Sequence, residues 1–184
     1  YDTLRLILCR WAILVEGDSD ELIIQKAYLK NYDKLPIEDG VDVISVGTSF
    51  LRFLKIADKL DKKVTVVTDS DGDIDALKNK YANYIGDNSK DSINICFDST
   101  IDEGDLQIGD SSFNYNTLEP KILKVNDLEK LNLIFNTEFT DEERMHRYMY
   151  NNKTECALKL FDTDEEINFP QYILDSINPD YVSE

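Results

Sequence analysis

The sequence has little of what a secreted, membrane-spanning or zinc-binding protein needs. Its three cysteines, Cys9, Cys96 and Cys156, lie far apart and form no Cys-x-x-Cys pair. An odd and dispersed set of this kind argues against a disulfide framework and a zinc site, and indicates a reducing compartment. No apolar run approaches the roughly 20 residues that span a bilayer, and no signal peptide is visible. We therefore expect a cytoplasmic protein that does not enter a membrane.

Basic residues are also scarce. Lys and Arg number 20 against 37 Asp and Glu, which gives a net charge of −17. A chain with this charge repels nucleic acid and anionic membranes unless cations or a partner offset it. A DNA-handling function therefore requires bound cations or positive charge from another part. Because the chain begins with Tyr1 rather than Met, we expect it to be a piece of a longer protein that supplies such charge.

Strand-like and helix-like segments alternate along the first half of the chain, which predicts an α/β fold. Four short apolar runs predict buried strands at residues 11–15, 41–47, 65–68 and 93–97. Between them, apolar residues recur at the spacing of amphipathic helices. Because crossover connections are right-handed, this order predicts a parallel four-stranded sheet flanked by helices, with every strand tip at one edge.

Helix boundaries are predicted from capping patterns. Asp18 with Glu21, and Thr140 with Glu143, each fit a capping box at a helix start. Residues 4–8 form a short apolar lead-in before the first strand. These patterns place one helix directly after the first strand and another in the second half of the chain.

The pattern changes after the fourth strand. Residues 98–116 are rich in Asp, Ser and Gly and predict a long loop or an irregular hairpin, and several helical segments then follow, the last over residues 170–177. We therefore predict an α/β core at residues 1–115 and a helical extension at residues 116–184.

The stretch that joins the third predicted strand to an acidic cluster is the most informative. Asp69, Asp71 and Asp73 follow residues 65–68, at the carboxyl end of the sheet, where open α/β folds bind ligands. Three carboxylates so close together repel one another, and a bound cation is the usual remedy. The cluster predicts a Mg²⁺ or Mn²⁺ site, and a solvated Asp/Gly turn is the alternative.

A second acidic group follows the first predicted strand. Glu16 stands at the strand tip, Gly17 allows the tight turn into the helix, and Asp20 lies one turn later over the same end of the sheet. Complementing the helix dipole is a sufficient structural reason for Asp20, but not for Glu16. The topology alone brings Glu16 towards the cluster that begins at Asp69.

These two acidic segments together resemble the signatures of the Toprim domain, the domain of type IA and type II topoisomerases, bacterial primases and OLD (overcoming lysogenisation defect) nucleases. The first is VEGDSDE at residues 15–21, and the second is VTDSDGD at residues 67–73. A further carboxylate four residues after the glutamate, here Asp20 after Glu16, is similar to the OLD nucleases and their Gabija-type relatives.

The resemblance extends into the tail and spans roughly residues 10 to 165. TLE at residues 117–119 resembles the family's later carboxylate-bearing segment, and NKTECA at residues 152–157 resembles its helix headed by a catalytic lysine. It implies that Glu16 and Lys153 are catalytic residues. The implied metal-binding set is Glu16, Asp20, Asp69, Asp71, Asp73 and Glu119.

By the same resemblance, the chain is a metal-dependent DNA endonuclease. Two Mg²⁺ or Mn²⁺ ions, on the order of 4 Å apart, would clamp the scissile phosphate, and Lys153 would offset charge in the transition state. The family's Toprim part follows an ABC-type ATPase domain, and no Walker A motif occurs here. We therefore expect the nuclease part of a larger ATPase-nuclease, assembled as a homo-oligomer through the missing parts, with antiphage defence as a family-level expectation.

Other interpretations remain open at this point. A phosphotransfer or phosphatase domain also has an acidic pocket at parallel strand tips, and a degenerate Toprim module could serve assembly without catalysis. A calcium-binding EF-hand is excluded, because its sixth and twelfth loop positions here hold Ile74 and Lys80. Lys153 could be an ordinary exposed helix lysine, and we expect His146 to be a surface residue rather than a base.

Overall fold

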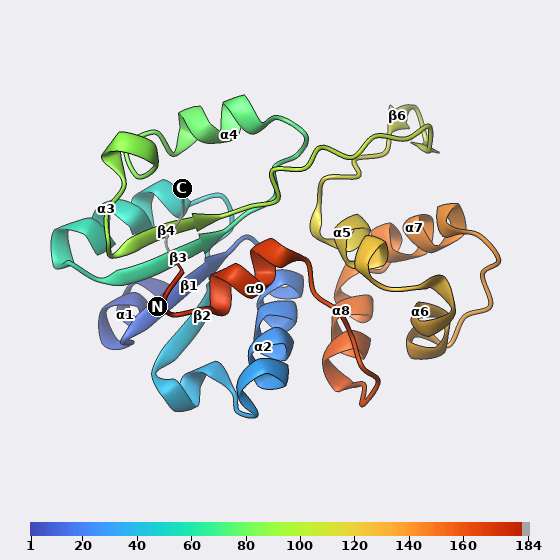
Figure 1. Ribbon diagram of the computed structural model, residues 1–184, viewed down its shortest axis with the longest axis horizontal. Helices are drawn as coiled ribbons and strands as arrows, with labels where there is room; N and C mark the ends of the chain where they lie inside the picture. The colour runs from blue at the N-terminus through green and yellow to red at the C-terminus, as the bar shows by residue number, and fades with distance from the viewer. Residues whose placement is uncertain (182–184) are drawn as a thin grey trace.

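The computed structural model describes residues 1–181 and contains the parallel four-stranded sheet that the sequence predicts (Figure 1). Its strands, in the spatial order β2-β1-β3-β4, are β1 (Trp11–Val15), β2 (Val41–Ser45), β3 (Lys63–Val67) and β4 (Ile93–Cys96). β1 is buried at every position, as expected for a central strand covered on both faces. Because every pair is parallel, all four strands end at one edge of the sheet.

The register of β1 against β3 positions the two acidic segments. Leu14 of β1 lies opposite Val66 of β3. Glu16 therefore stands two residues beyond this pair on one strand, and Asp69 stands three residues beyond it on the neighbouring strand. The ladder of backbone hydrogen bonds thus brings residues that are distant in sequence to the same stretch of the sheet edge.

Helices cover both faces of the sheet. One face is covered by α1 (Asp2–Leu8), α3 (Phe50–Leu60) and α4 (Ile74–Lys80), which pack around Leu14 and Val66. The predicted lead-in before the first strand is therefore a helix, and Leu6 buries it against the core. The other face is covered by α2 (Asp18–Tyr32) and by α9 (Gln171–Ile177) from the end of the chain.

The second half of the chain forms the predicted irregular hairpin and helices. The hairpin pairs β5 (Gln107–Ile108) with β6 (Ser111–Ser112). The helices are α5 (Leu118–Val125), α6 (Leu128–Phe135), α7 (Glu142–Asn151) and α8 (Lys153–Asp162), ahead of α9.

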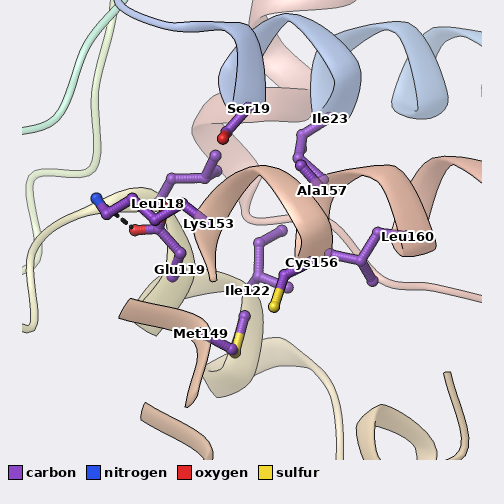
Figure 2. Close-up of a pocket in the computed structure, with 10 residues that line it drawn as sticks. All are labelled: Ser19, Ile23, Leu118, Glu119, Ile122, Met149, Lys153, Cys156, Ala157 and Leu160. Carbon is purple, nitrogen blue, oxygen red and sulfur yellow. Dashed lines mark ion pairs between the residues drawn. The ribbon is translucent and has the colours of Figure 1, made fainter. Parts of the chain in front are cut away.

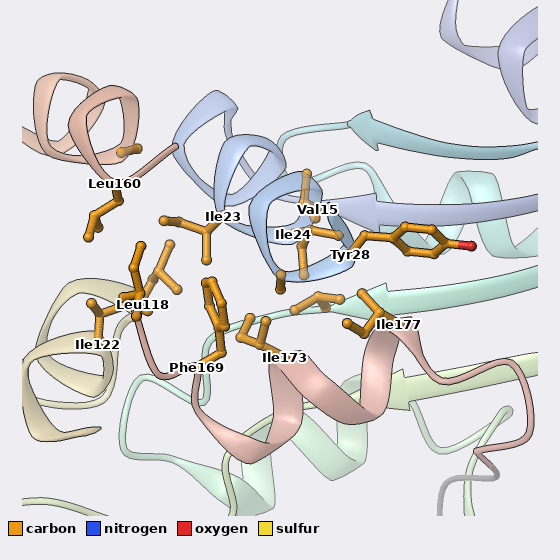
Figure 3. Close-up of a cluster of buried hydrophobic side chains, with 14 of the residues drawn as sticks. Val15, Ile23, Ile24, Tyr28, Leu118, Ile122, Leu160, Phe169, Ile173 and Ile177 are labelled. Atoms are coloured by element: carbon orange, nitrogen blue, oxygen red, sulfur yellow. The ribbon is translucent and has the colours of Figure 1, made fainter. Parts of the chain in front are cut away.

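One apolar core joins this helical part to the sheet. Ile23 of α2 shares a buried cluster with Leu118 of α5, Leu160 of α8 and Ile173 of α9 (Figure 3). The division at residues 115 and 116 stays a prediction. No helix within residues 1–181 combines the length and apolar character that crossing a membrane requires.

Both predicted capping boxes are wrong by one residue. Gly17, in extended backbone, is the N-cap of α2, and the Asp20 carboxylate accepts the Gly17 N–H at 3.0 Å. At α7 the cap is Asp141, whose carboxylate accepts the Arg144 N–H at 2.9 Å. Asp is at least as good an N-cap as Thr, so Asp141 takes the position expected for Thr140.

Candidate active site

Carboxylates from three segments of the chain, and a lysine from a fourth, line one pocket of about 350 Å³ at the carboxyl edge of the sheet. Its residues are Glu16, Gly17, Ser19, Asp20, Asp69, Asp71, Thr117, Leu118, Glu119 and Lys153. The structure therefore brings together every predicted site residue except Asp73. Ser19 and Thr117 also line the pocket and were not singled out in the sequence, although Ser19 lies inside the first acidic motif and Thr117 inside the TLE segment at residues 117–119.

Asp20 is held in the pocket by the start of α2. Its carboxylate accepts the Gly17 N–H, which fixes the side chain over the strand tip. Burial raises the pKa of Asp20 to about 6, and the charges of Glu119 and Glu16 add to this rise. Ionising this carboxyl group is therefore unfavourable in its buried place among like charges, and a bound cation would relieve this penalty.

Asp69 experiences the same repulsion more strongly. Burial raises the pKa of Asp69 well above its usual range, and Asp20, Glu119 and Asp71 raise it further. Carboxylates shift one another's pKa in this way only when they lie close together. The electrostatics therefore support the convergence that the register of β1 and β3 implies.

A lysine lies at the tail side of the pocket. Lys153 opens α8, and its Nζ lies 3.2 Å from Oε2 of Glu119, in the first turn of α5 (Figure 2). Burial alone would lower the pKa of Lys153, but Glu119, and then Asp69 and Asp20, raise it above its ordinary value. Lys153 therefore stays a cation at neutral pH, among the carboxylates. Apolar side chains of α2, α5 and α8 pack behind the pair, with Glu119 only 8% exposed.

The aspartates after β3 divide between two tasks. Asp71 lines the pocket with a left-handed backbone (φ 51°), and its Oδ1 accepts the Asn114 amide at 2.9 Å. Asp73 lies outside the pocket lining, because its carboxylate caps α4 by accepting the Ala76 N–H at 2.9 Å. The metal-binding assignment of Asp73 stays a prediction, and the structure gives this side chain a structural task.

A network of asparagines holds the loop before α5 against the acidic loop. Asn114 bonds Asp71, and its Oδ1 accepts the Asn116 N–H at 2.8 Å. The Asn116 side chain accepts the Asp102 N–H at 2.8 Å and donates to the Asp102 carbonyl at 3.0 Å. Asp102 is in turn paired with the buried Lys121 of α5 at 2.6 Å. This link between the two sides of the pocket had no signal in the sequence beyond a polar loop rich in Asp, Ser and Gly.

The expectation that His146 is a surface residue is wrong. Its side chain is buried, 8% exposed, with ring centroids of Phe113 and Tyr115 at 5.1 and 5.3 Å. Its Nδ1 has no hydrogen-bond partner in residues 1–181. His146 is absent from the pocket lining, so it packs the hairpin against α7 and takes no part in the acidic site.

The donors in the pocket suit a hard divalent cation. They are carboxylate oxygens, which Mg²⁺ and Mn²⁺ prefer, and their mutual repulsion is the kind that such a cation removes. Among residues 1–181, no group of three Asp, Glu, His or Cys side chains is already arranged closely enough to hold a metal ion. The residues therefore fit metal binding in kind, and binding would draw the carboxylates inwards.

The comparison with protein families agrees with this geometry. Residues 7–71 match the family model described as "Overcoming lysogenization defect protein-like, TOPRIM domain". This segment of the chain is therefore similar to an OLD-like Toprim domain. The match covers β1, β2 and β3 and ends at Asp71, so it includes both acidic motifs.

Solved structures extend the likeness beyond this Toprim segment. The platinum-phased structure of the C-terminal region of the Xanthomonas campestris pv. campestris OLD protein is 19% identical, with a TM-score of 0.63. It covers 94% of this chain and 92% of that chain. The mercury-phased structure of the same region is 17% identical with a TM-score of 0.54, covering 92% of this chain and 93% of that one. At this identity the likeness shows the fold, which includes the helical tail. No curated protein matches the chain.

Proposed function

We propose that the pocket hydrolyses phosphodiester bonds in DNA with the help of divalent cations. The observation that carries the proposal is the gathering of five carboxylates and one lysine at the edge of the sheet. Burial, and then repulsion among the carboxylates, raises the pKa of Asp20 and of Asp69. The OLD-like Toprim family supports a reaction on nucleic acid rather than on a small phosphate ester.

The cations would be held by the carboxylates of the pocket, which are Glu16, Asp20, Asp69, Asp71 and Glu119. Two Mg²⁺ or Mn²⁺ ions, when bound, would polarise the phosphate, lower the pKa of the attacking water and stabilise the leaving oxygen. Glu16 and Asp69 project from strand ends, so they would hold their ligand positions most rigidly.

Lys153 supplies the positive charge that the protein itself brings to the site. Its ammonium is the cation nearest to Glu119, at 3.2 Å, and its raised pKa keeps it protonated. A point cation at this place offsets negative charge that builds up on the phosphate as the bond breaks. In the ligand-free protein the same charge offsets the carboxylates.

The family also supports a wider setting for this chain. We propose that it is the nuclease part of a larger cytoplasmic ATPase-nuclease with an ABC-type ATPase domain, which acts as a homo-oligomer in antiphage defence. With a net charge of −17, the isolated chain should bind DNA weakly.

The test is nicking of supercoiled plasmid in Mg²⁺, Mn²⁺ or Ca²⁺. Glu16→Gln and Lys153→Ala should lose activity. Asp18→Asn changes a carboxylate in the first turn of α2 that lies outside the pocket, and should keep activity. Hydrolysis of a small phosphate ester without nicking would support the phosphotransfer interpretation instead. Equal activity in Glu16→Gln and the wild type would overturn the proposed site.

A further inference from the structure

Positive charge is unevenly distributed in this acidic chain. Residues 50–63 hold five basic and two acidic residues, whereas residues 118–162, which span α5 to α8, hold nine acidic and seven basic ones. α3 lies at one side of the molecule and α5 to α8 lie at the other (Figure 1). The two sides of the acidic pocket therefore differ in the sign of their net charge.

Three cations form a stripe along the outside of α3. Arg52, Lys55 and Lys59 follow one another at helical spacings of three and four residues, and all three are exposed, opposite the face that buries Phe53 and Leu54. The stripe is about 10 Å long, a length over which one DNA strand presents about three phosphates.

These three cations have no carboxylate of their own. No salt bridge or side-chain hydrogen bond joins Arg52, Lys55 or Lys59 to any residue in the described range, 1–181. The nearest acid on the helix, Asp58, is already paired with Lys90. Most cations of α5 to α8 are neutralised instead, as Arg147 is by Glu143 at 2.9 Å. Unpaired cations in a chain of this charge are available to an external polyanion.

The stripe begins beside the acidic pocket. The Gly47 N–H donates to the Glu16 carbonyl at 3.0 Å, and Ser49, two residues later, is the N-cap of α3. Lys80 of α4 adds charge at the first turn of α3, with its Nζ 5.5 Å from the Phe50 ring centroid. A phosphate backbone that leaves the pocket over α3 therefore meets unpaired cations, whereas over α5 to α8 most cations are already paired with carboxylates.

We infer that the DNA on one side of the scissile phosphate lies along α3, on the stripe of Arg52, Lys55 and Lys59. This inference rests on the proposed function, because it assigns a path to the substrate of that site. It favours a nucleic-acid backbone over a membrane or an acidic protein, since the stripe continues directly from a pocket suited to phosphodiesters.

The test measures binding separately from cleavage. Affinity of the chain for a short fluorescent DNA duplex is followed by anisotropy over a series of salt concentrations, on a Glu16→Gln background that prevents hydrolysis. The triple change Arg52→Gln, Lys55→Gln and Lys59→Gln should raise Kd about tenfold or more at low salt. It should also reduce the slope of log Kd against log salt by up to about 2.7, at about 0.9 per phosphate contact.

A matched control removes the same charge from the other side. Lys130→Gln, Arg144→Gln and Arg147→Gln change α6 and α7 by three charges, and should alter Kd less than about twofold. Equal losses in the two triple variants, or no measurable binding by the parent, would overturn the assignment. Binding to anionic lipid vesicles but not to duplex would overturn it in favour of a membrane surface.

The inference and the proposed function fail in different ways. If the α3 variant loses DNA affinity while the wild type never nicks plasmid in any metal, the binding path stands and the nuclease proposal fails. If wild type nicks plasmid and the α3 variant nicks and binds as well as wild type, the nuclease stands and the path over α3 is wrong.

Discussion

The two sides of the acidic pocket are built by different means. On the strand side, Glu16 and Asp69 follow β1 and β3, whose relative position is set by a parallel backbone ladder. On the tail side, Glu119 and Lys153 come from α5 and α8, which are placed by apolar packing and by the 3.2 Å ion pair between them. Backbone ladders leave little freedom of register, whereas packed helices can shift. We therefore expect the strand side to dominate metal binding and the tail side to adjust to the ligand.

The largest effect should come from the strand side. Glu16→Gln or Asp69→Asn removes a ligand from the most rigid part of the pocket, and should reduce the nicking rate by about 10³-fold or more. Initial rates at saturating Mn²⁺ would measure this, with Asp18→Asn as the control. Rates within tenfold of the wild type would show that the strand side does not hold the catalytic cations.

Asp20 should show how much folding stability the crowded carboxylates of the strand side remove when no metal is bound. Its pKa is about 6 in the folded protein against 3.8 as the ordinary value, so the folded state binds more protons between these values. Stability therefore falls as pH rises from about 4 to about 6, and the full penalty, up to about 3 kcal/mol, is present above pH 6. In EDTA, Asp20→Asn should raise the urea midpoint at pH 8 and leave it nearly unchanged below pH 4.

Metal gives the complementary measurement for Asp20. Added Mn²⁺ should stabilise the wild type more than Asp20→Asn at pH 8, because the wild type has the additional ligand. A variant that is less stable than the wild type in EDTA at pH 8 would contradict the assignment of Asp20 as a strained carboxylate.

The tail side should separate chemistry from metal binding. Lys153→Met removes the positive charge near the phosphate, and should slow nicking by about 10²-fold. The same change frees Glu119 from its ion pair, so metal affinity should stay equal or increase. Isothermal titration with Mn²⁺ measures affinity independently of cleavage. A weaker metal affinity in this variant would show that Lys153 organises the ligands rather than the transition state.

What the sequence could predict follows the same division. The strands and the gathering of Glu16 with the Asp69 segment were predictable, because parallel topology alone places strand tips at one edge. The exact caps were not, since Gly17 and Asp141 compete with Asp18 and Thr140 at nearly equal free energy.

Tertiary contacts decided the rest. α9 completes the cover of the sheet from the far end of the chain, and no local pattern specifies where a short helix docks. His146 is buried because Phe113 and Tyr115 of the hairpin segment lie against α7. The positions of Glu119 and Lys153 came from the family resemblance, because helices placed by packing leave no periodic signal of their mutual distance.

Loss of the Asn114 link between the two sides should have a moderate effect on metal affinity. Asn114→Ala removes the amide that holds Asp71 at 2.9 Å and loosens the loop leading to α5. We expect this change to reduce the free energy of metal binding by about 1 kcal/mol. This corresponds to roughly a fivefold weaker metal affinity, with little change in the unfolding midpoint. Asn151→Ala is the matched control, since its amide bonds the Arg147 carbonyl at 2.9 Å within α7. Equal effects of the two changes would remove Asn114 from the site.

The smallest effect should come from His146, on the tail side but outside the pocket. His146→Phe keeps the aromatic contact with Phe113 and Tyr115 and removes a buried Nδ1 that has no partner in residues 1–181. An unsatisfied buried polar atom is costly, so the variant should gain up to about 1 kcal/mol in urea unfolding and nick plasmid at the wild-type rate. Burial lowers the pKa of His146, so its charged form is disfavoured and this gain should be larger at pH 5 than at pH 8. A loss of nicking in a stably folded His146→Phe protein would mean that the hairpin contact reaches the acidic pocket, and that the two sides are coupled through α7 as well as through Asn114.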